Sequence, residues 1–128
     1  MKLTKAQRAA IHDKFGGRCA YCGEDLPEKW HVDHLVPIVR NWGKFSKERP
    51  CEKPENDNLA NMMPACPACN ISKHSYTLEF WREMIAGHIK SLNLYHPIYR
   101  LAKSYGLVVE TGNEVEFFFE KNGGKENG

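Results

Sequence analysis

The sequence has no run of about 18 or more apolar residues, which a membrane-spanning helix requires. Its N-terminal segment, residues 1–5, also lacks the apolar stretch of a secretory signal peptide. We therefore expect no membrane partner and a cytoplasmic location, where paired cysteines stay reduced and free to bind metal. The formal net charge of only +2 excludes a uniformly basic nucleic-acid binder, so any phosphate binding has to come from a local cluster of positive charge.

The sequence also shows no helical row of Arg, Asn and Gln side chains of the kind that reads DNA bases. Its lysines and arginines concentrate in residues 36–53, whereas glutamates gather in residues 110–120. A basic face beside the central part of the chain is one interpretation, and a solvated loop is the other. If the chain binds DNA, we expect binding through phosphates with low sequence specificity, or with specificity supplied by a partner.

Two short cysteine motifs are the clearest positive signal: Cys19-Ala-Tyr-Cys22 and Cys66-Pro-Ala-Cys69. Each presents two thiolates, and two such pairs complete the tetrahedral coordination of one zinc ion. A chain of 128 residues with 41% apolar content can build one domain with a modest core, which a bound metal would stabilise. We predict a structural zinc site of these four cysteines and assign no role to the fifth, Cys51.

Asp33 and His34 lie between the two cysteine motifs, and Asn70 directly follows the second. Phosphodiester hydrolysis needs a base that deprotonates water and a hard cation that stabilises negative charge, and His, Asp and Asn can serve these needs. Because zinc would hold Cys69, its neighbour Asn70 would be fixed in place. An oxygen-rich site favours Mg²⁺ or Mn²⁺, whereas four thiolates favour zinc. Taken singly, each of these residues is typical of an ordinary surface, and only their ordered combination suggests a hydrolytic site.

Local patterns predict an α+β fold, beginning with a capping box at Thr4 and Gln7 and a helix stop at Gly16-Gly17. The predicted elements are a helix over residues 5–15, two short strands over 30–33 and 36–39, a long loop over 41–58, a helix from Pro67, a helix from Thr77 with apolar positions 81, 85, 89 and 92, a third helix after His96-Pro97, and a β-hairpin of 107–109 with 115–119. The last residues, 122–128, are predicted to be disordered.

Three segments in order resemble the zinc-containing branch of the HNH endonucleases: Gly17–Gly23, Val32–Pro37 and Asn61–Lys73. The resemblance implies a ββα-metal core stabilised by a four-cysteine zinc site, and a metal-dependent endonuclease that nicks or cuts DNA. It implies His34 as the general base, Asp33 and Asn70 as ligands of the catalytic Mg²⁺ or Mn²⁺, and Asn61 as a brace of the loop that carries the base. The longer connection between His34 and Asn61 departs from the family pattern and puts DNA contacts by that loop in doubt.

Three further residues are candidates for the site. Lys73 matches a basic position of the family, where phosphate contact and packing are both open. His31 could add a metal ligand or phosphate contact, although an ordinary strand histidine is the favoured interpretation, and His74 is a weaker ligand candidate.

We expect residues 1–128 to form a single domain, with a core at 17–75, a helical and hairpin extension at 76–121 that packs as scaffold, and the tail. The extension is similar to small HNH proteins of bacteriophages and prophages, which implies a phage-encoded protein and phage packaging proteins as further partners besides DNA. We expect a monomer or weak dimer. Two other interpretations stay open: a zinc-stabilised DNA-binding module without catalysis, and a phage structural protein with a decayed nuclease core.

Overall fold

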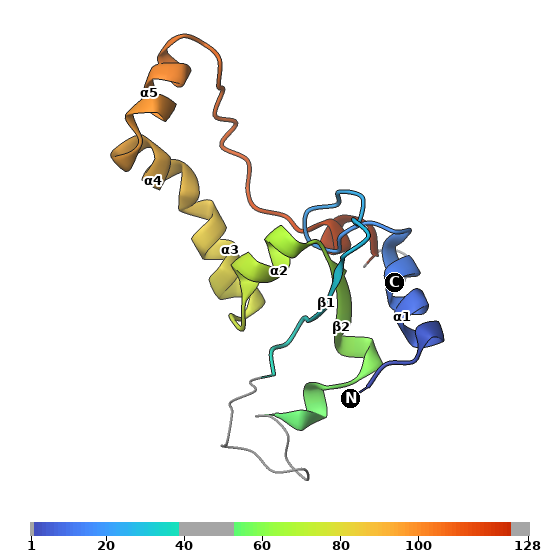
Figure 1. Ribbon diagram of the computed structural model, residues 1–128. Helices are drawn as coiled ribbons and strands as arrows, with labels where there is room; N and C mark the ends of the chain where they lie inside the picture. Colours follow the sequence, from blue (N-terminus) through green and yellow to red (C-terminus); the bar gives the residue numbers. More distant parts are fainter. Residues whose placement is uncertain (1, 39–52, 124–128) are drawn as a thin grey trace. The chain divides into compact units, whose positions relative to one another are not determined.

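The computed structural model describes residues 2–38 and 53–123 (Figure 1). The described chain divides into two compact units, one made of Met1–Leu78 with Glu116–Gly128 and the other of Glu79–Val115. Among the described helices, none has both the length and the apolar character needed to cross a membrane. Several expected elements, among them most of the loop over 41–58, Cys51 and the end of the tail, lie outside the described residues.

The first unit begins with helix α1, Lys5–His12, which continues as the 3₁₀ turn η1, Asp13–Phe15. The predicted capping box is confirmed, because Thr4 Oγ1 accepts a hydrogen bond from Gln7 N at 3.1 Å and Gln7 Oε1 accepts one from Thr4 N at 3.0 Å. Gly16, with a φ of 67°, ends the helical segment in the left-handed conformation that glycine adopts without strain. The predicted boundaries of this helix are therefore correct.

The centre of the first unit is a two-stranded antiparallel sheet followed by a helix. Strand β1, His31–His34, pairs with β2, Met62–Ala65, in a register that sets Asp33 opposite Met63. Helix α2, Pro67–Lys73, follows β2 directly and packs beside β1, while α1 packs on β2 (Figure 1). This ββα arrangement confirms the predicted fold class, and Pro67 stands in the first turn of α2 as expected.

The predicted second strand over residues 36–39 is wrong where the structure describes it, because residues 36–38 form no strand. Val36 makes its backbone hydrogen bonds to the side chain of Asn61, with Val36 N donating at 2.9 Å and Val36 O accepting at 2.8 Å. Since that amide satisfies Val36, β1 takes its partner from the residues that lead into the second cysteine motif. Two short 3₁₀ turns, η2 at Pro54–Asn56 and η3 at Leu59–Asn61, lead into β2.

The C-terminal aromatic segment packs on the first cysteine motif. Phe118 N donates to Tyr21 O at 2.9 Å, and Phe119 N donates to Ala20 O at 2.8 Å. The rings of Phe117 and Phe119 stack on each other at 6.3 Å, and each meets the Tyr21 ring edge-on. The π-helical turn η4, Phe119–Gly123, ends the described chain.

This packing explains why the predicted C-terminal β-hairpin is wrong. Residues 107–117, all described, form no strand, and Leu107 and Val109 are 80% and 79% exposed. The backbone of Phe118 and Phe119 makes its hydrogen bonds to residues of the first cysteine motif instead of to residues 107–109. The aromatic residues that suggested a strand thus contact a segment that is distant in the sequence, the first cysteine motif.

The second unit is helical. The helix expected from Thr77 is divided at Gly87 into α3, Leu78–Ala86, and α4, His88–Tyr95, and α5, Pro97–Ser104, follows as predicted. Helices α4 and α5 pack on each other, and Arg100 Nη1 donates to Asn93 O at 2.6 Å. Glu110 accepts hydrogen bonds from Asn93, Tyr99 and Lys103, which ties the chain after α5 to this pair.

Candidate functional site

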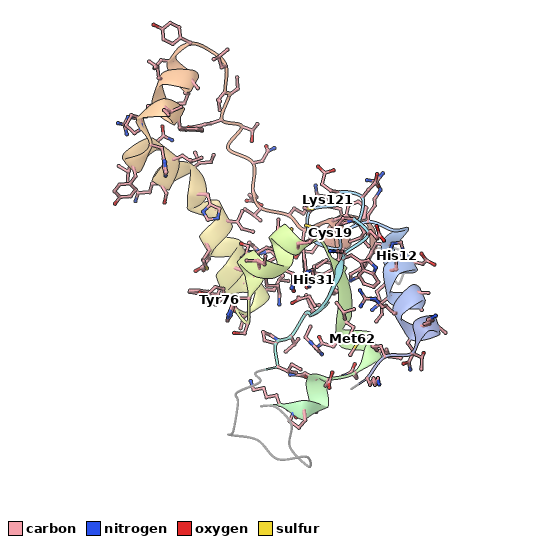
Figure 2. The ribbon with its side chains drawn as sticks, viewed as in Figure 1. His12, Cys19, His31, Met62, Tyr76 and Lys121 are labelled. Atoms are coloured by element: carbon pink, nitrogen blue, oxygen red, sulfur yellow. The ribbon has the colours of Figure 1, made fainter. Side chains whose placement is uncertain are left out.

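The four cysteines of the two motifs come together in the first unit, as the sequence predicts. Their sulfur atoms all lie within 4.8 Å of one another, and Cys22 Sγ lies 3.8 Å from Cys66 Sγ. Zinc–sulfur bonds of about 2.3 Å in a tetrahedron set sulfurs about 3.8 Å apart, so the cluster is compatible with a zinc site. Backbone N–H groups point at the sulfurs, with Tyr21 N 3.4 Å from Cys19 Sγ and Cys69 N 3.4 Å from Cys66 Sγ. Cys19 is fully buried and is labelled in Figure 2.

The electrostatics of the cluster call for a cation. The hydrogen bond from the Cys69 thiol lowers the pKa of Cys19 to about 4. Burial raises the pKa of Cys22 to about 11, and the hydrogen bond to Cys19 raises the pKa of Cys69. The thiolate is therefore favoured at Cys19 and disfavoured at Cys22 and Cys69, because several negative charges cannot share so small a volume. A divalent ion removes this repulsion, which makes the donor set suitable for zinc.

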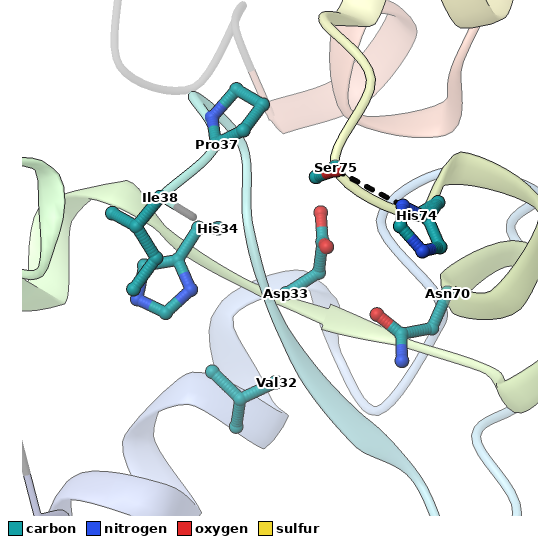
Figure 3. Close-up of a pocket in the computed structure, with 8 residues that line it drawn as sticks. All are labelled: Val32, Asp33, His34, Pro37, Ile38, Asn70, His74 and Ser75. Atoms are coloured by element: carbon teal, nitrogen blue, oxygen red, sulfur yellow. Dashed lines mark hydrogen bonds between the residues drawn. The ribbon is translucent and has the colours of Figure 1, made fainter. Parts of the chain in front are cut away.

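An open pocket of about 230 Å³ lies where β1 ends and α2 passes beside it (Figure 3). Three predicted residues, Asp33, His34 and Asn70, line it. The other lining residues are Val32, Pro37, Ile38, His74 and Ser75. Figure 3 shows the Asn70 side chain extending toward Asp33, while the His34 ring lies on the other side of the strand. Alternation along β1 thus directs a carboxylate and an imidazole to different parts of one pocket.

Asp33 is buried and held by two residues. Its Oδ2 accepts a hydrogen bond from Tyr21 Oη at 2.5 Å and lies 3.0 Å from Lys73 Nζ. Burial, followed by the charge of Asp33, raises the pKa of Tyr21 well above its ordinary value, so the phenol keeps its proton and donates. The side chain of Lys73 is 0% exposed, and its Nζ also donates to His34 O at 2.9 Å. The Lys73 ammonium therefore faces the protein interior and offers no surface to a phosphate.

The amide of Asn61 ties two segments together. Its Nδ2 donates to Val36 O and to Asn56 O, both at 2.8 Å, and its Oδ1 accepts from Val36 N at 2.9 Å. The backbone of Asn61 also accepts from Leu35 N at 2.9 Å. These bonds fix the turn that follows His34 against the segment that precedes β2.

Sequence reasoning missed Asp57. Its Oδ1 lies 2.9 Å from His34 Nε2, and the side chains of His34 and Asp57 are 15% and 9% exposed. Burial alone would raise the pKa of Asp57, but its hydrogen bonds, the one with His34 among them, hold it below the ordinary value. No local motif marks Asp57, because it lies 23 positions after His34 and only the folded chain brings the two together.

Comparison with known proteins agrees with this geometry. Residues 19–76, which contain the cysteine cluster and the pocket residues, match the family described as HNH endonuclease. We call this matched segment, residues 19–76, the HNH domain. The chain is 33% identical over 81 residues to YoqL of Bacillus subtilis (strain 168), which is named as an SPbeta prophage-derived HNH endonuclease. The match covers 62% of this chain and 33% of YoqL, so the chain spans about a third of the length of that curated relative. No solved structure matches the chain.

The remaining candidates occupy different places in the HNH domain. His74 ends α2 with a φ of 52°, lines the pocket, and has its Nδ1 3.0 Å from Ser75 Oγ. His31 is an exposed residue of β1 and is absent from the described lining of the pocket (Figure 2). The pocket therefore brings together Asp33, His34, Asn70 and His74, while Lys73 lies buried behind Asp33.

Proposed function

We propose that the HNH domain hydrolyses phosphodiester bonds of DNA with one divalent ion, with His34 as the general base. The observation that carries this proposal is the meeting of Asp33, His34 and Asn70 around one pocket of an HNH domain. A DNA-binding module without catalysis would need the four cysteines but not these three side chains. The prophage source of YoqL supports a phage origin for this chain, and phage packaging proteins remain an expected partner.

The donor set fits a hard divalent cation. Tyr21 and Lys73 both engage Oδ2 of Asp33, so its other oxygen and the amide oxygen of Asn70 are the proposed ligands, with His74 as a further candidate. Bound there, Mg²⁺ or Mn²⁺ would stabilise negative charge on the scissile phosphate and the leaving oxygen. The four cysteines would hold a separate, structural zinc ion, because soft thiolates select it over magnesium.

His34→Ala should lower the rate of plasmid cleavage by a factor on the order of 10² or more, because the base that accepts the proton of water is removed. Supercoiled plasmid with Mg²⁺ or Mn²⁺ is the substrate, and the conversion to nicked and linear forms is followed by gel. His88→Ala, on an exposed position of α4, is the matched control and should cleave like the wild type. Near-wild-type cleavage by His34→Ala would move the base to another residue.

Asp33→Asn and Asn70→Ala should each reduce cleavage severely in limiting Mg²⁺, because each weakens the proposed ion site. Asparagine is preferred to alanine at position 33, since the neutral amide keeps the volume next to Lys73. Higher Mn²⁺ should restore part of the activity by mass action. Cleavage rates are measured across a metal titration, with Asn113→Ala, at an exposed position after α5, as control. Unchanged metal dependence in both variants would contradict the proposal that Asp33 and Asn70 bind the catalytic ion.

A further inference from the structure

The contact between His34 and Asp57 differs from a surface ion pair. Nε2 and Oδ1 are 2.9 Å apart, and both side chains are largely buried. The chain offers a direct comparison at its surface, where His12 Nδ1 and Asp13 Oδ1 are 3.0 Å apart but Asp13 is 76% exposed. Hydrogen bonds that are shielded from water hold a more fixed geometry than exposed ones.

The charge state of Asp57 sets the direction of the hydrogen bond. The pKa of Asp57 lies below its ordinary value, so at neutral pH the group is a carboxylate, which can only accept hydrogen bonds. Nε2 of His34 must therefore carry the proton. In the neutral ring Nδ1 is then the nitrogen with a free lone pair, and it is the one that can accept a proton from water.

The segment that carries Asp57 is held in place by several hydrogen bonds. Asp57 N donates to Pro54 O at 3.0 Å and ends η2, and the next residue, Asn58, accepts from Asn61 N at 3.1 Å. Asn61 Nδ2 bonds both Asn56 O and Val36 O. A single amide thus joins the residue before Asp57 to the turn after His34, which fixes both partners of the contact.

We infer that Asp57 is a positioning residue that holds His34 in its Nε2–H form, which leaves Nδ1 free to accept the proton of water. The inference rests on the proposed function. As the oxygen of water bonds to phosphorus and the bond to the leaving oxygen breaks, the proton of water passes to Nδ1. The imidazolium that results carries a positive charge next to the Asp57 carboxylate, which stabilises it.

The first test is spectroscopic and does not depend on cleavage. In protein labelled with ¹⁵N-histidine, the Nε2–H proton of His34 should resonate downfield and exchange slowly with water, and the His34→Ala variant assigns it. Asp57→Ala should abolish this signal, whereas Asp13→Ala, at the exposed pair, should leave it unchanged. Thermal unfolding checks that the variant folds, and Asp57→Leu, which has a similar volume and no hydrogen-bond acceptor, replaces it if it does not. Persistence of the protected signal in either Asp57 variant would overturn the inference.

The second test is a double-mutant cycle in the plasmid assay. Asp57→Ala should lower the cleavage rate about 10- to 100-fold in the wild-type background. In the His34→Ala background the same substitution should cause no further loss, because Asp57 acts through His34. If Asp57→Ala leaves cleavage unchanged, or causes an equal loss in both backgrounds, the positioning role of Asp57 is contradicted. The proposed function of the domain would still stand. Absence of cleavage by the wild type overturns the proposed function itself and with it the base role of His34.

Discussion

Cys66→Ser is expected to unfold the HNH domain rather than merely slow the proposed cleavage. Structural zinc contributes roughly 10 kcal/mol or more of folding free energy in small metal-dependent units, which is comparable to the whole stability of a domain. The substitution removes a metal ligand without removing the cap of helix α2. Cys66 also caps helix α2 through its Sγ, and serine is a good N-cap, so the helix keeps its cap while the metal loses a ligand.

The measurement combines elemental analysis with circular dichroism. The wild type should hold one tightly bound zinc per chain and melt cooperatively, whereas Cys66→Ser should lose zinc and its cooperative transition. Cys51→Ser is the matched control, because Cys51 belongs to neither motif, and it should keep both. A folded wild type without metal, whose cysteines are paired in disulfides, would contradict the zinc assignment.

Chelation should separate the two proposed metals. EDTA should stop cleavage by competing for the weakly held Mg²⁺ before it removes zinc from four thiolates. The protein at that point should be folded and inactive, and added Mg²⁺ should restore cleavage.

The sequence predicted the parts of the site that depend on local chemistry. The spacing of the cysteines, the Asp33-His34 pair and the capping box at Thr4 each carry a physical requirement that a few neighbouring residues satisfy. The structure brings all four cysteines together and places Asp33, His34 and Asn70 around one pocket. Their catalytic roles remain proposals that the variants above test.

The sequence could not predict contacts between distant segments. The strand-like run at Val36 forms no strand, because the side chain of Asn61 satisfies its backbone, and the sequence pattern gives no sign of such a bond. Gly87 divides a helix whose apolar spacing is continuous, since glycine lowers helix stability by about 1 kcal/mol. The Phe117–Phe119 run bonds to the first cysteine motif, so its strand-forming composition gave a wrong hairpin.

The sequence left the role of Lys73 open, because both phosphate contact and packing were compatible with it. Its ammonium is fully buried between Asp33 Oδ2 at 3.0 Å and His34 O at 2.9 Å. A buried cation needs such partners because transfer from water is costly. The same bonds hold the Asp33 carboxylate and the His34 backbone, so Lys73 braces both proposed catalytic positions from behind.

Lys73→Met should therefore destabilise the protein by about 3–5 kcal/mol, because removal of one partner leaves the buried Asp33 carboxylate without its cation. Methionine keeps most of the apolar volume of the lysine side chain, so the loss reports the charge rather than a cavity. Urea unfolding at equal zinc content gives the free energy. Lys90→Met, at an exposed position of α4, is the control and should change stability by no more than about 0.5 kcal/mol.

The double variant Lys73→Met with Asp33→Asn separates a buried ion pair from general packing. If the uncompensated carboxylate is the cause, the second substitution should recover part of the lost stability, although cleavage should stay severely reduced. The unfolding free energies of the wild type, the two single variants and the double variant give the coupling free energy between Lys73 and Asp33, which distinguishes the two explanations. Additive losses, or a Lys73→Met protein that unfolds at the same urea concentration as Lys90→Met, would show that the contact between Lys73 and Asp33 does not stabilise the fold.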